Sequence, residues 1–522
     1  MPYQVIVTVG DLLIAARGPH LDLINLSSTT LIFSWKPPPA SSKQNQPELC
    51  TETTIEQRPE ISNDTAEPEN SPPVKKIKLT QSKTSEVDAS FKSKKSESDH
   101  PKNENIPSSI DSPNISLLKI TKDGKHIVLV TREDKSIRVL EIIGTGQSRK
   151  INQLSQRLMP KRPCALALTD DDTFKIIIAD KFGDVYSLPL LEPSHDGFSK
   201  SPVQNTVPKL SHFTPVANEL TVHSKRNKKA LESQRKQKYQ NSQKSQMNFS
   251  CELLLGHVSM LTDVKLAMVD GYGYIITSDR DEHIRVSRGI PQTYIIENYC
   301  LGHSEFVSRL CIPETKQSIL ISGGGDDDLF IWDWRRGSLL SKVGLKDHIA
   351  AVRSKLFGEI DQNETLNSRI KVAVSEILHV DLTVDCQVVN LFVISCESLP
   401  ALFTFTLSPE NKLEYAETVW TSGNVLSLSV TSDHSLKSKS LLVSIDNIHK
   451  PGSSIDIREE DTSNMMPLCR FDFDGVTLKR IPLVIEIPVD KSFKDMHRTS
   501  AEISDLYYGI EILRKRCDEV QI

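Results

Sequence analysis

The chain has 522 residues, 25% of them charged, and its formal net charge is −5. This balance argues against a protein that coats nucleic acid by itself, because neutralising phosphates requires a broad basic surface. The nine cysteines are far apart, without a CxxC pair or a histidine at ligand spacing, which is typical of reduced intracellular thiols. Because no charge-free apolar run reaches the ~18 residues that span a bilayer, the sequence predicts no membrane anchor.

The first 192 residues contain two β-like stretches separated by a polar one. Residues 1–36 and 111–192 consist of short apolar runs punctuated by Gly, Asp and Ser, which predict strands joined by tight turns. Residues 37–110 are rich in Ser, Pro, Glu and Lys and lack the apolar surface that offsets the entropy of ordering a chain. We therefore expect a disordered insertion at 37–110 between two parts of one all-β domain.

A compact basic cluster lies inside this first insertion. Lys75, Lys76 and Lys78 follow a Pro-Pro pair, which is the kind of sequence that an import receptor reads in extended form. The cluster predicts a nuclear protein. The alternative is a group of solvated lysines.

The rest of the chain repeats the alternation. Residues 193–250, full of Ser, Gln and Lys, are predicted to be a second, basic, disordered insertion. Its positive charges between Lys225 and Lys238 could attract RNA, act as a second import signal or merely be solvated, and no interleaved aromatic residue would add specificity. Residues 251–490 return to β-like runs. The apolar residues of 491–522 fall at helical spacing, which predicts an amphipathic helix that packs on this protein or on a partner.

An internal repeat indicates the architecture. Four segments share a polar turn followed by an alternating strand, and they begin at Thr131, Ala179, Ser278 and Gly323. The middle spacing is about twice the other two and exceeds one repeat period by about 53 residues. This excess equals the length of the second insertion, which we therefore expect in a loop between adjacent units. A period of about 46 residues is that of a four-stranded propeller blade.

About 390 residues at this period give seven or eight blades, and seven is the more usual closure. We place the blades at residues 1–36, 111–144, 160–192, 251–292, 298–345, 350–408 and 415–490. The predicted fold class is an all-β propeller with two disordered loop insertions and a short C-terminal helix.

Two Gly-His pairs identify the blades as WD repeats. In this type of blade a histidine, a strand hydroxyl, a turn aspartate and a tryptophan hydrogen-bond in series and pin the outer strand to the inner ones. One unit carries the full set, His303, Ser322, Asp326 and Trp332. We assign these residues a structural role, because catalytic acid–base pairs do not recur at blade period.

The preceding unit carries an incomplete set. His257, Thr277 and Asp281 are assigned to the same network, but Ser287 stands where the tryptophan is expected. A second glycine pattern, around Gly144 and Gly146, is similar to the loop by which methyltransferases hold S-adenosylmethionine, yet no helix pattern follows it. We interpret it as the turn after the third strand of a blade.

The run Gly323-Gly324-Gly325 is interpreted as another tight turn rather than a phosphate cradle. The sequence therefore predicts no catalytic, cofactor-binding or metal-binding residue.

Three stretches go beyond a generic repeat: residues 178–186, 255–264 and 276–284. A generic blade requires neither Phe182 nor Met260 nor the acidic and basic quartet at 279–282. On these residues the chain resembles the non-catalytic WD-repeat subunit of the eukaryotic tRNA (guanine-N7) methyltransferase, in its fungal form. The resemblance is dense through Trp334, looser afterwards, and does not cover the two insertions.

The resemblance implies a division of labour between two chains. A separate catalytic subunit would bind S-adenosylmethionine and the target guanine in the tRNA variable loop. This chain would bind no cofactor, form a heterodimer with that subunit, hold it in an active shape, and meet tRNA only through the complex.

The resemblance also places the partner contact at the blade of Asp281. The implied contact residues are Lys181, Arg280, Glu282, His283 and Arg285. Strand alternation over residues 282–286 is expected to bury the two aliphatic side chains and to turn His283 and Arg285 outward, with Arg285 meeting a partner carboxylate. The alternative is a solvated charge at the blade edge.

Two rival functions remain open at this point. Propellers host unrelated roles, so a WD-repeat scaffold of another nuclear assembly, in ribosome biogenesis or a ubiquitin ligase, would have the same fold. An enzyme with its active site in the central channel would need convergent polar groups that the sequence does not display.

Overall fold

The computed structural model describes residues 1–38, 112–171, 174–192, 249–358, 371–384, 386–433, 438–459, 465–485 and 500–515. The disorder predicted for 37–110 and 193–250, and the two basic clusters within those insertions, fall almost wholly outside the described residues.

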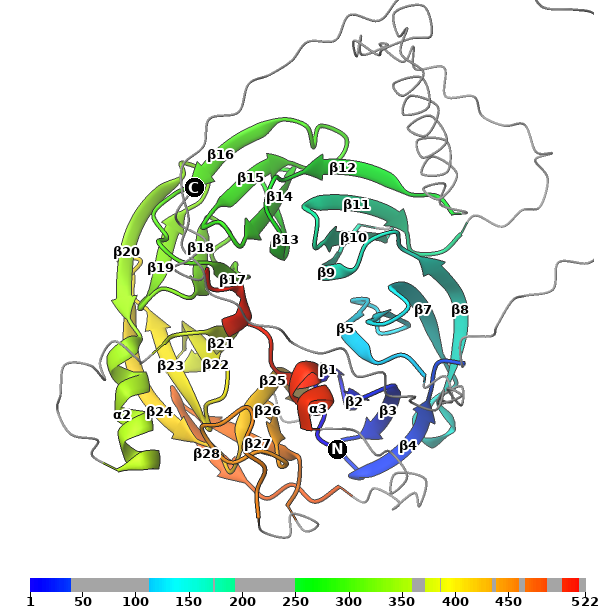
Figure 1. Cartoon of the computed structure of the whole chain (residues 1–522), viewed down its shortest axis with the longest axis vertical. Helices are drawn as coiled ribbons and strands as arrows, with labels where there is room; N and C mark the ends of the chain where they lie inside the picture. Colours follow the sequence, from blue (N-terminus) through cyan, green and yellow to red (C-terminus); the bar gives the residue numbers. More distant parts are fainter. Residues whose placement is uncertain are drawn as a thin grey trace, which may run out of the picture. The chain divides into compact units, whose positions relative to one another are not determined.

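Seven antiparallel sheets of four strands stand around a common axis (Figure 1). In every sheet the strands follow one another in chain order, the first nearest the axis and the fourth outermost. We number the sheets blades 1 to 7 along the chain. The seven-bladed propeller predicted from the repeat is confirmed.

Blades 1 to 3 comprise β1 (Val5–Val9), β2 (Leu12–Arg17), β3 (His20–Asn25), β4 (Thr30–Trp35); β5 (Ile115–Ile120), β6 (His126–Thr131), β7 (Ser136–Ile143), β8 (Lys150–Leu158); β9 (Pro163–Leu168), β10 (Lys175–Asp180), β11 (Asp184–Pro189) and β12 (Glu252–Gly256). Blades 4 and 5 comprise β13 (Leu261–Val269), β14 (Tyr272–Asp279), β15 (Ile284–Arg288), β16 (Ile296–Cys300); β17 (Val307–Cys311), β18 (Ile319–Gly324), β19 (Asp328–Asp333) and β20 (Ser338–Gly344). Blades 6 and 7 comprise β21 (Val374–Val384), β22 (Gln387–Cys396), β23 (Ala401–Leu407), β24 (Leu413–Trp420); β25 (Asn424–Asp433), β26 (Ser438–Asp446), β27 (Leu468–Asp474) and β28 (Thr477–Ile481).

Each blade is covered by a neighbour on both faces, which explains the continuous apolar runs of the middle strands. On β14 of blade 4, Ile276 packs with Trp332 of blade 5, whereas the residue before it, Ile275, packs with Ile177 of blade 3. Alternate side chains of one strand therefore enter two different cores. Because neither face of a propeller sheet is exposed to solvent, its middle strands do not alternate between apolar and polar side chains.

The predicted position of the second insertion was wrong. Residues 193–250 separate β11 from β12, the third and fourth strands of blade 3, and not two adjacent blades. The blade expected at 251–292 accordingly begins at Leu261 and ends at Cys300. A repeat period sets the length of a unit but not its phase, and counting from the Gly-His pair starts each unit one strand too early.

The ring closes without a strand shared between its ends. Blade 1 is built from residues 5–35 and blade 7 from residues 424–481, and no strand of one joins the sheet of the other among the described residues. Hydrogen bonds between β1 and β25 hold blade 1 against blade 7 instead. The Thr8 hydroxyl lies 2.8 Å from the Ser429 hydroxyl and donates to the Val430 carbonyl at 2.6 Å, and Thr431 donates to the Gly10 carbonyl at 3.0 Å.

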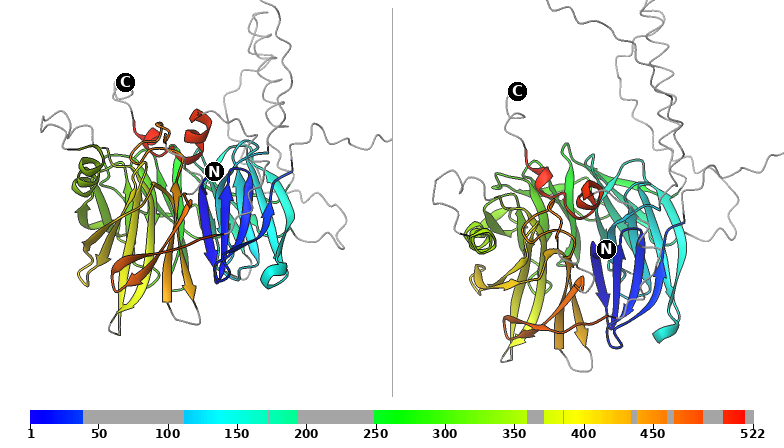
Figure 2. Two further views of the ribbon diagram at one scale, coloured as in Figure 1. Left: turned by 90° about the horizontal axis from the view of Figure 1, so that it is seen from below. Right: turned by 60° about the horizontal axis from the view of Figure 1, so that its bottom comes forward.

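Helices are few in the described part of the chain. α2 (Lys346–Phe357) connects blades 5 and 6, and η1 (Gly146–Ser148) forms the turn between β7 and β8. Within the predicted C-terminal helical tail, α3 (Ser500–Tyr507) and η4 (Glu511–Leu513) lie on one face of the ring (Figure 2). None of the described helices is long and apolar enough to cross a membrane.

Candidate functional site on blades 3 to 5

Four buried side chains form a series of hydrogen bonds in blade 5. Nδ1 of His303 lies 2.7 Å from Oδ2 of Asp326, and Nε2 of the same ring lies 2.7 Å from the Ser322 hydroxyl. The indole N–H of Trp332 donates to that hydroxyl at 2.8 Å. The structure thus joins all four residues that the sequence assigned to this network, from the β16–β17 loop to the third strand.

Asp326 also holds the loop that follows the histidine. It accepts the Ser304 N–H at 2.9 Å and the Glu305 N–H at 3.3 Å. Burial would raise the pKa of the Asp326 carboxyl, but hydrogen bonds from His303 and Ser304 outweigh it and hold the pKa below its usual value. The His303 side chain is fully buried and stacks on Phe330 with ring centres 3.9 Å apart. No substrate can reach it, so the network is structural.

The equivalent network in blade 4 uses a different aspartate from the one predicted. His257 contacts the Thr277 hydroxyl at 2.8 Å and Oδ2 of Asp279 at 3.4 Å. The assignment of Asp281 was wrong: its carboxylate is 45% exposed and pairs with Lys515 at 3.2 Å. Asp279 can replace it because the two turns differ in shape, and Asp279 caps its own turn by accepting the N–H groups of Asp281 and His283.

Arg285 occupies the place that Phe330 has in blade 5, because each lies opposite the network hydroxyl of the preceding strand. Its side chain is 8% exposed. Nε donates to the Ser287 hydroxyl at 2.9 Å and Nη1 to the Gly256 carbonyl at 3.0 Å. The outward orientation predicted for Arg285 was wrong, since blade 3 covers this face. Two of its three nitrogens are engaged inside the ring.

The other predicted contact residues lie in the exposed turns of blades 3 and 4. Lys181 is exposed, and the His283 side chain is 50% exposed. Arg280 and Glu282 instead meet the chain's own C-terminus: Nε of Arg280 donates to the Leu513 carbonyl at 2.8 Å, and Glu282 pairs with Lys515 at 2.9 Å. The structure therefore places Lys181 and His283 on the open surface and ties the other two to the tail.

The glycine patterns occupy turns and close approaches. Gly144 and Gly146, with φ of 87° and 57°, lie between β7 and β8, as interpreted from the sequence. Gly323 and Gly324, however, are the last residues of β18 rather than part of a turn. A Cβ on Gly324 would lie 1.8 Å from the Phe306 carbonyl oxygen, so the close approach of two strands requires glycine there. No group of three or more metal-ligating side chains occurs in the described ranges.

Comparison with known proteins identifies the family. The family described as the tRNA methyltransferase TRM82 WD40 domain matches residues 13–471. The chain belongs to this family. A trm82 protein of Sclerotinia sclerotiorum, named as a tRNA (guanine-N(7)-)-methyltransferase non-catalytic subunit, is 40% identical and covers 99% of both chains.

TRM82 of Coccidioides immitis, with the same description, is 35% identical over 97% of this chain and 95% of its own. The solved structure of U3-55K aligns with 88% of this chain and 93% of its own, with a TM-score of 0.47 and 12% identity. The family resemblance inferred from residues 178–186, 255–264 and 276–284 is confirmed.

The structure adds three residues to the surface expected for this TRM82 family member. Phe182 is 63% exposed in the turn after β10, and Nζ of Lys161 lies 3.9 Å from the centre of its ring. The Lys181 N–H donates to the Arg162 carbonyl at 3.0 Å, which brings the two turns together. We call Lys161, Arg162, Lys181 and Phe182 the basic patch. Sequence reasoning singled out Phe182 as unusual but could not place the residues of the β8–β9 loop beside it.

The positive charges of the basic patch are poorly neutralised. Burial and the nearby positive charge of Arg162 lower the pKa of Lys181. Burial and the charge of Arg132 lower the pKa of Arg162, and Glu133 offsets this only in part.

Proposed function

We propose that this chain is the scaffold subunit of a tRNA (guanine-N7) methyltransferase and holds a catalytic subunit in an active conformation. The observation that carries the proposal is the 40% identity, over 99% of both chains, to a protein named as the non-catalytic subunit. The reaction would form N7-methylguanosine in the tRNA variable loop. The two subunits would form a heterodimer, with S-adenosylmethionine on the catalytic subunit and tRNA bound by the complex.

The polar residues of the described blades agree with a scaffold. The His–Asp pairs of the two WD networks, His303 with Asp326 and His257 with Asp279, lie inside the blades and share their hydrogen bonds with neighbouring strands. Such groups stabilise a rigid support. They do not present a proton donor or acceptor to a substrate.

The basic patch is the surface we propose for the catalytic subunit, together with His283. An exposed aromatic ring beside under-neutralised cations fits a protein surface that offers carboxylates around an apolar centre. Large aromatic side chains contribute much of the affinity at such interfaces. Because Lys181 and Phe182 belong to a stretch that generic WD blades do not require, this choice also agrees with the sequence.

Substitutions in the basic patch test this surface. Phe182→Ala, which removes an exposed ring, should leave thermal unfolding within about 1 °C of the parent but weaken binding of the catalytic subunit about tenfold or more. The matched control is Tyr272→Ala, because Tyr272 is 71% exposed on blade 4 but lies at the β13–β14 turn. Equal affinities of the Phe182 variant, the control and the parent in calorimetric titration would show that the interface lies elsewhere.

Nuclear localisation is proposed from Lys75, Lys76 and Lys78 alone, which lie outside the described residues. Deleting residues 40–105 should reduce the nuclear accumulation of this chain fused to a fluorescent protein. Unchanged accumulation would contradict an import signal in this segment.

A further inference from the structure

The junction between blades 7 and 1, which we call the seam, is where the first and last blades of the propeller meet. The other junctions are crossed by continuous chain, whereas this one relies on hydrogen bonds between β1 and β25 and on an apolar cluster that joins β1, β2 and β3 to β26 and β27. Non-covalent contacts alone therefore resist opening of the ring at the seam.

The C-terminal segment, residues 500–515, is anchored on blades 7 and 6. The Tyr508 hydroxyl donates to Oδ2 of Asp446 at 2.5 Å and accepts from Nδ2 of Asn424 at 3.1 Å; both blade residues are fully buried. The carboxylate of Glu397 accepts the N–H groups of three successive residues, Gly509, Ile510 and Glu511. Charge-assisted bonds to a backbone fix a segment more firmly than exposed ion pairs do.

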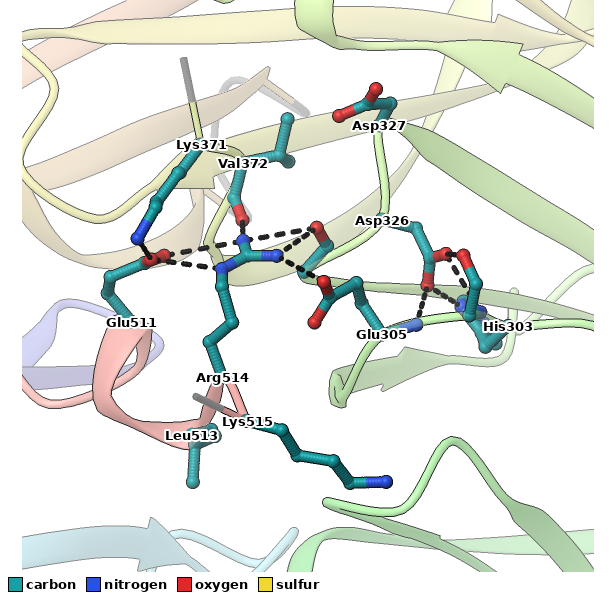
Figure 3. A network of polar contacts seen from close by, with 12 residues as sticks. His303, Glu305, Asp326, Asp327, Lys371, Val372, Glu511, Leu513, Arg514 and Lys515 are labelled. Carbon is teal, nitrogen blue, oxygen red and sulfur yellow. Dashed lines mark hydrogen bonds and ion pairs between the residues drawn. The ribbon is translucent and has the colours of Figure 1, made fainter. Parts of the chain in front are cut away.

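The far end of the segment is anchored on blades 5 and 6 (Figure 3). The Arg514 guanidinium donates to the Gly325 carbonyl at 3.2 Å and the Val372 carbonyl at 2.8 Å, and it pairs with Glu305 at 2.9 Å. Its side chain is only 16% exposed. Lys515 then reaches the two acidic residues in the turn of blade 4.

The near end of the segment lies on the other side of the seam. Arg132, in the turn after β6 of blade 2, donates to the Asp505 carbonyl. The Tyr507 hydroxyl donates to the carbonyl of Pro2, at 3.5 Å, in the residues that lead into blade 1. One short segment is therefore bonded to blades 7 and 6 on one side of the seam and to blade 2 and the approach to blade 1 on the other.

We propose that the C-terminal segment is a clasp that closes the propeller ring. Opening the seam would break its contacts on one side or the other, so docking of the segment opposes separation of blades 7 and 1. The face of blades 6 and 7 around Glu397, Asp446 and Asn424 is thus a binding site whose ligand is a segment of the same chain. The inference concerns the single chain and does not rest on the proposed function.

Truncation after residue 499 tests the clasp. The truncated chain should unfold at a temperature lower by on the order of 5 °C. Amide hydrogen exchange should accelerate at least tenfold in β1 and β25, which border the seam, while β10 of blade 3, which is away from the seam, keeps its protection. An unchanged unfolding temperature together with unchanged exchange at the seam would overturn the proposal.

A synthetic peptide of residues 500–515 provides the second test. Added to the truncated chain, it should restore protection in β1 and β25, and the peptide with Arg514→Ala should restore much less. If the truncated chain does not fold, the full-length variant Tyr508→Phe answers the question, with Tyr415→Phe as its control because the Tyr415 hydroxyl bonds only Thr418 on an exposed strand. Faster seam exchange in the Tyr508 variant alone supports the clasp, and equal exchange in both variants contradicts it.

Discussion

Blades 4 and 5 solve the same packing problem with different chemistry. In blade 5 the network histidine stacks on Phe330 and the network ends in Trp332. In blade 4 the corresponding positions hold Arg285 and Ser287; Arg285 donates to the Ser287 hydroxyl and to the Gly256 carbonyl. The missing tryptophan is therefore not a gap in blade 4. A buried guanidinium that donates two hydrogen bonds takes over the role of two stacked rings, at a higher cost if its partners are changed.

Removing the tryptophan of blade 5 should have the largest effect. Trp332 is fully buried, so Trp332→Ala leaves a large cavity and deprives Ser322 of its donor. We expect a loss of about 3–5 kcal/mol of unfolding free energy. Denaturant unfolding measures it, and a loss below 1 kcal/mol would mean that the blade does not depend on this ring.

Arg285→Glu should follow closely and distinguishes a buried from an outward side chain. The substitution places a carboxylate beside the Gly256 carbonyl in a site that is 8% exposed, and should cost about 3 kcal/mol. The milder Arg285→Met keeps the volume and should cost about 1–2 kcal/mol. If Arg285→Glu unfolds like the parent but fails to bind the catalytic subunit, the side chain is a surface contact and our description of blade 4 is wrong.

The two aspartates of blade 4 should differ in their effect. Asp279→Ala removes an acceptor that is buried and holds both the turn and His257, and should cost about 1–3 kcal/mol. Asp281→Ala breaks an ion pair with Lys515 that is exposed on both sides, and should cost at most about 0.5 kcal/mol. Thermal unfolding of the two variants side by side checks the reassignment. The reverse order would restore Asp281 to the network.

Lowering the pH should reduce the contribution of Asp326 to the stability of blade 5. We expect this effect to be the smallest of those considered at neutral pH. Its pKa in the folded chain lies below the unfolded value near 3.9, so unfolding takes up a proton and the contribution to stability is present above about pH 5. It is lost as the pH falls through the folded pKa. The stability difference between the parent and Asp326→Asn should therefore shrink from pH 6 to pH 3. A constant difference over that range would show that the carboxylate is not specifically stabilised.

How far the sequence could predict the structure depended on whether a feature is local. The period of the repeat and the Gly-His pairs were enough for seven blades and for the complete network around Trp332. The residue at which each blade begins could not be predicted from the repeat, because the outermost strand of blade 3 lies beyond an insertion of some 60 residues. Arg285 was misplaced because alternation assumes one solvated face, and a propeller blade has none.

The remaining features depend on residues far apart in the chain. Glu397 and Asp446 meet the C-terminal segment more than 60 positions away, and no pattern around either residue signals it. Lys161 reaches Phe182 because the pairing of β9 with β10 in blade 3 brings the loop before β9 beside the turn after β10. Such contacts follow from the folded chain and not from any local sequence pattern.

The central claim is that this chain supplies support and no chemistry, and methylation kinetics test it most directly. The catalytic subunit at fixed concentration is titrated with this chain, and N7-methylguanosine formation in tRNA is measured. Activity should rise from a low baseline and saturate at one equivalent, while this chain alone forms no product and shows no S-adenosylmethionine binding by calorimetry. Full activity of the catalytic subunit alone, or stoichiometric cofactor binding by this chain, would contradict the account.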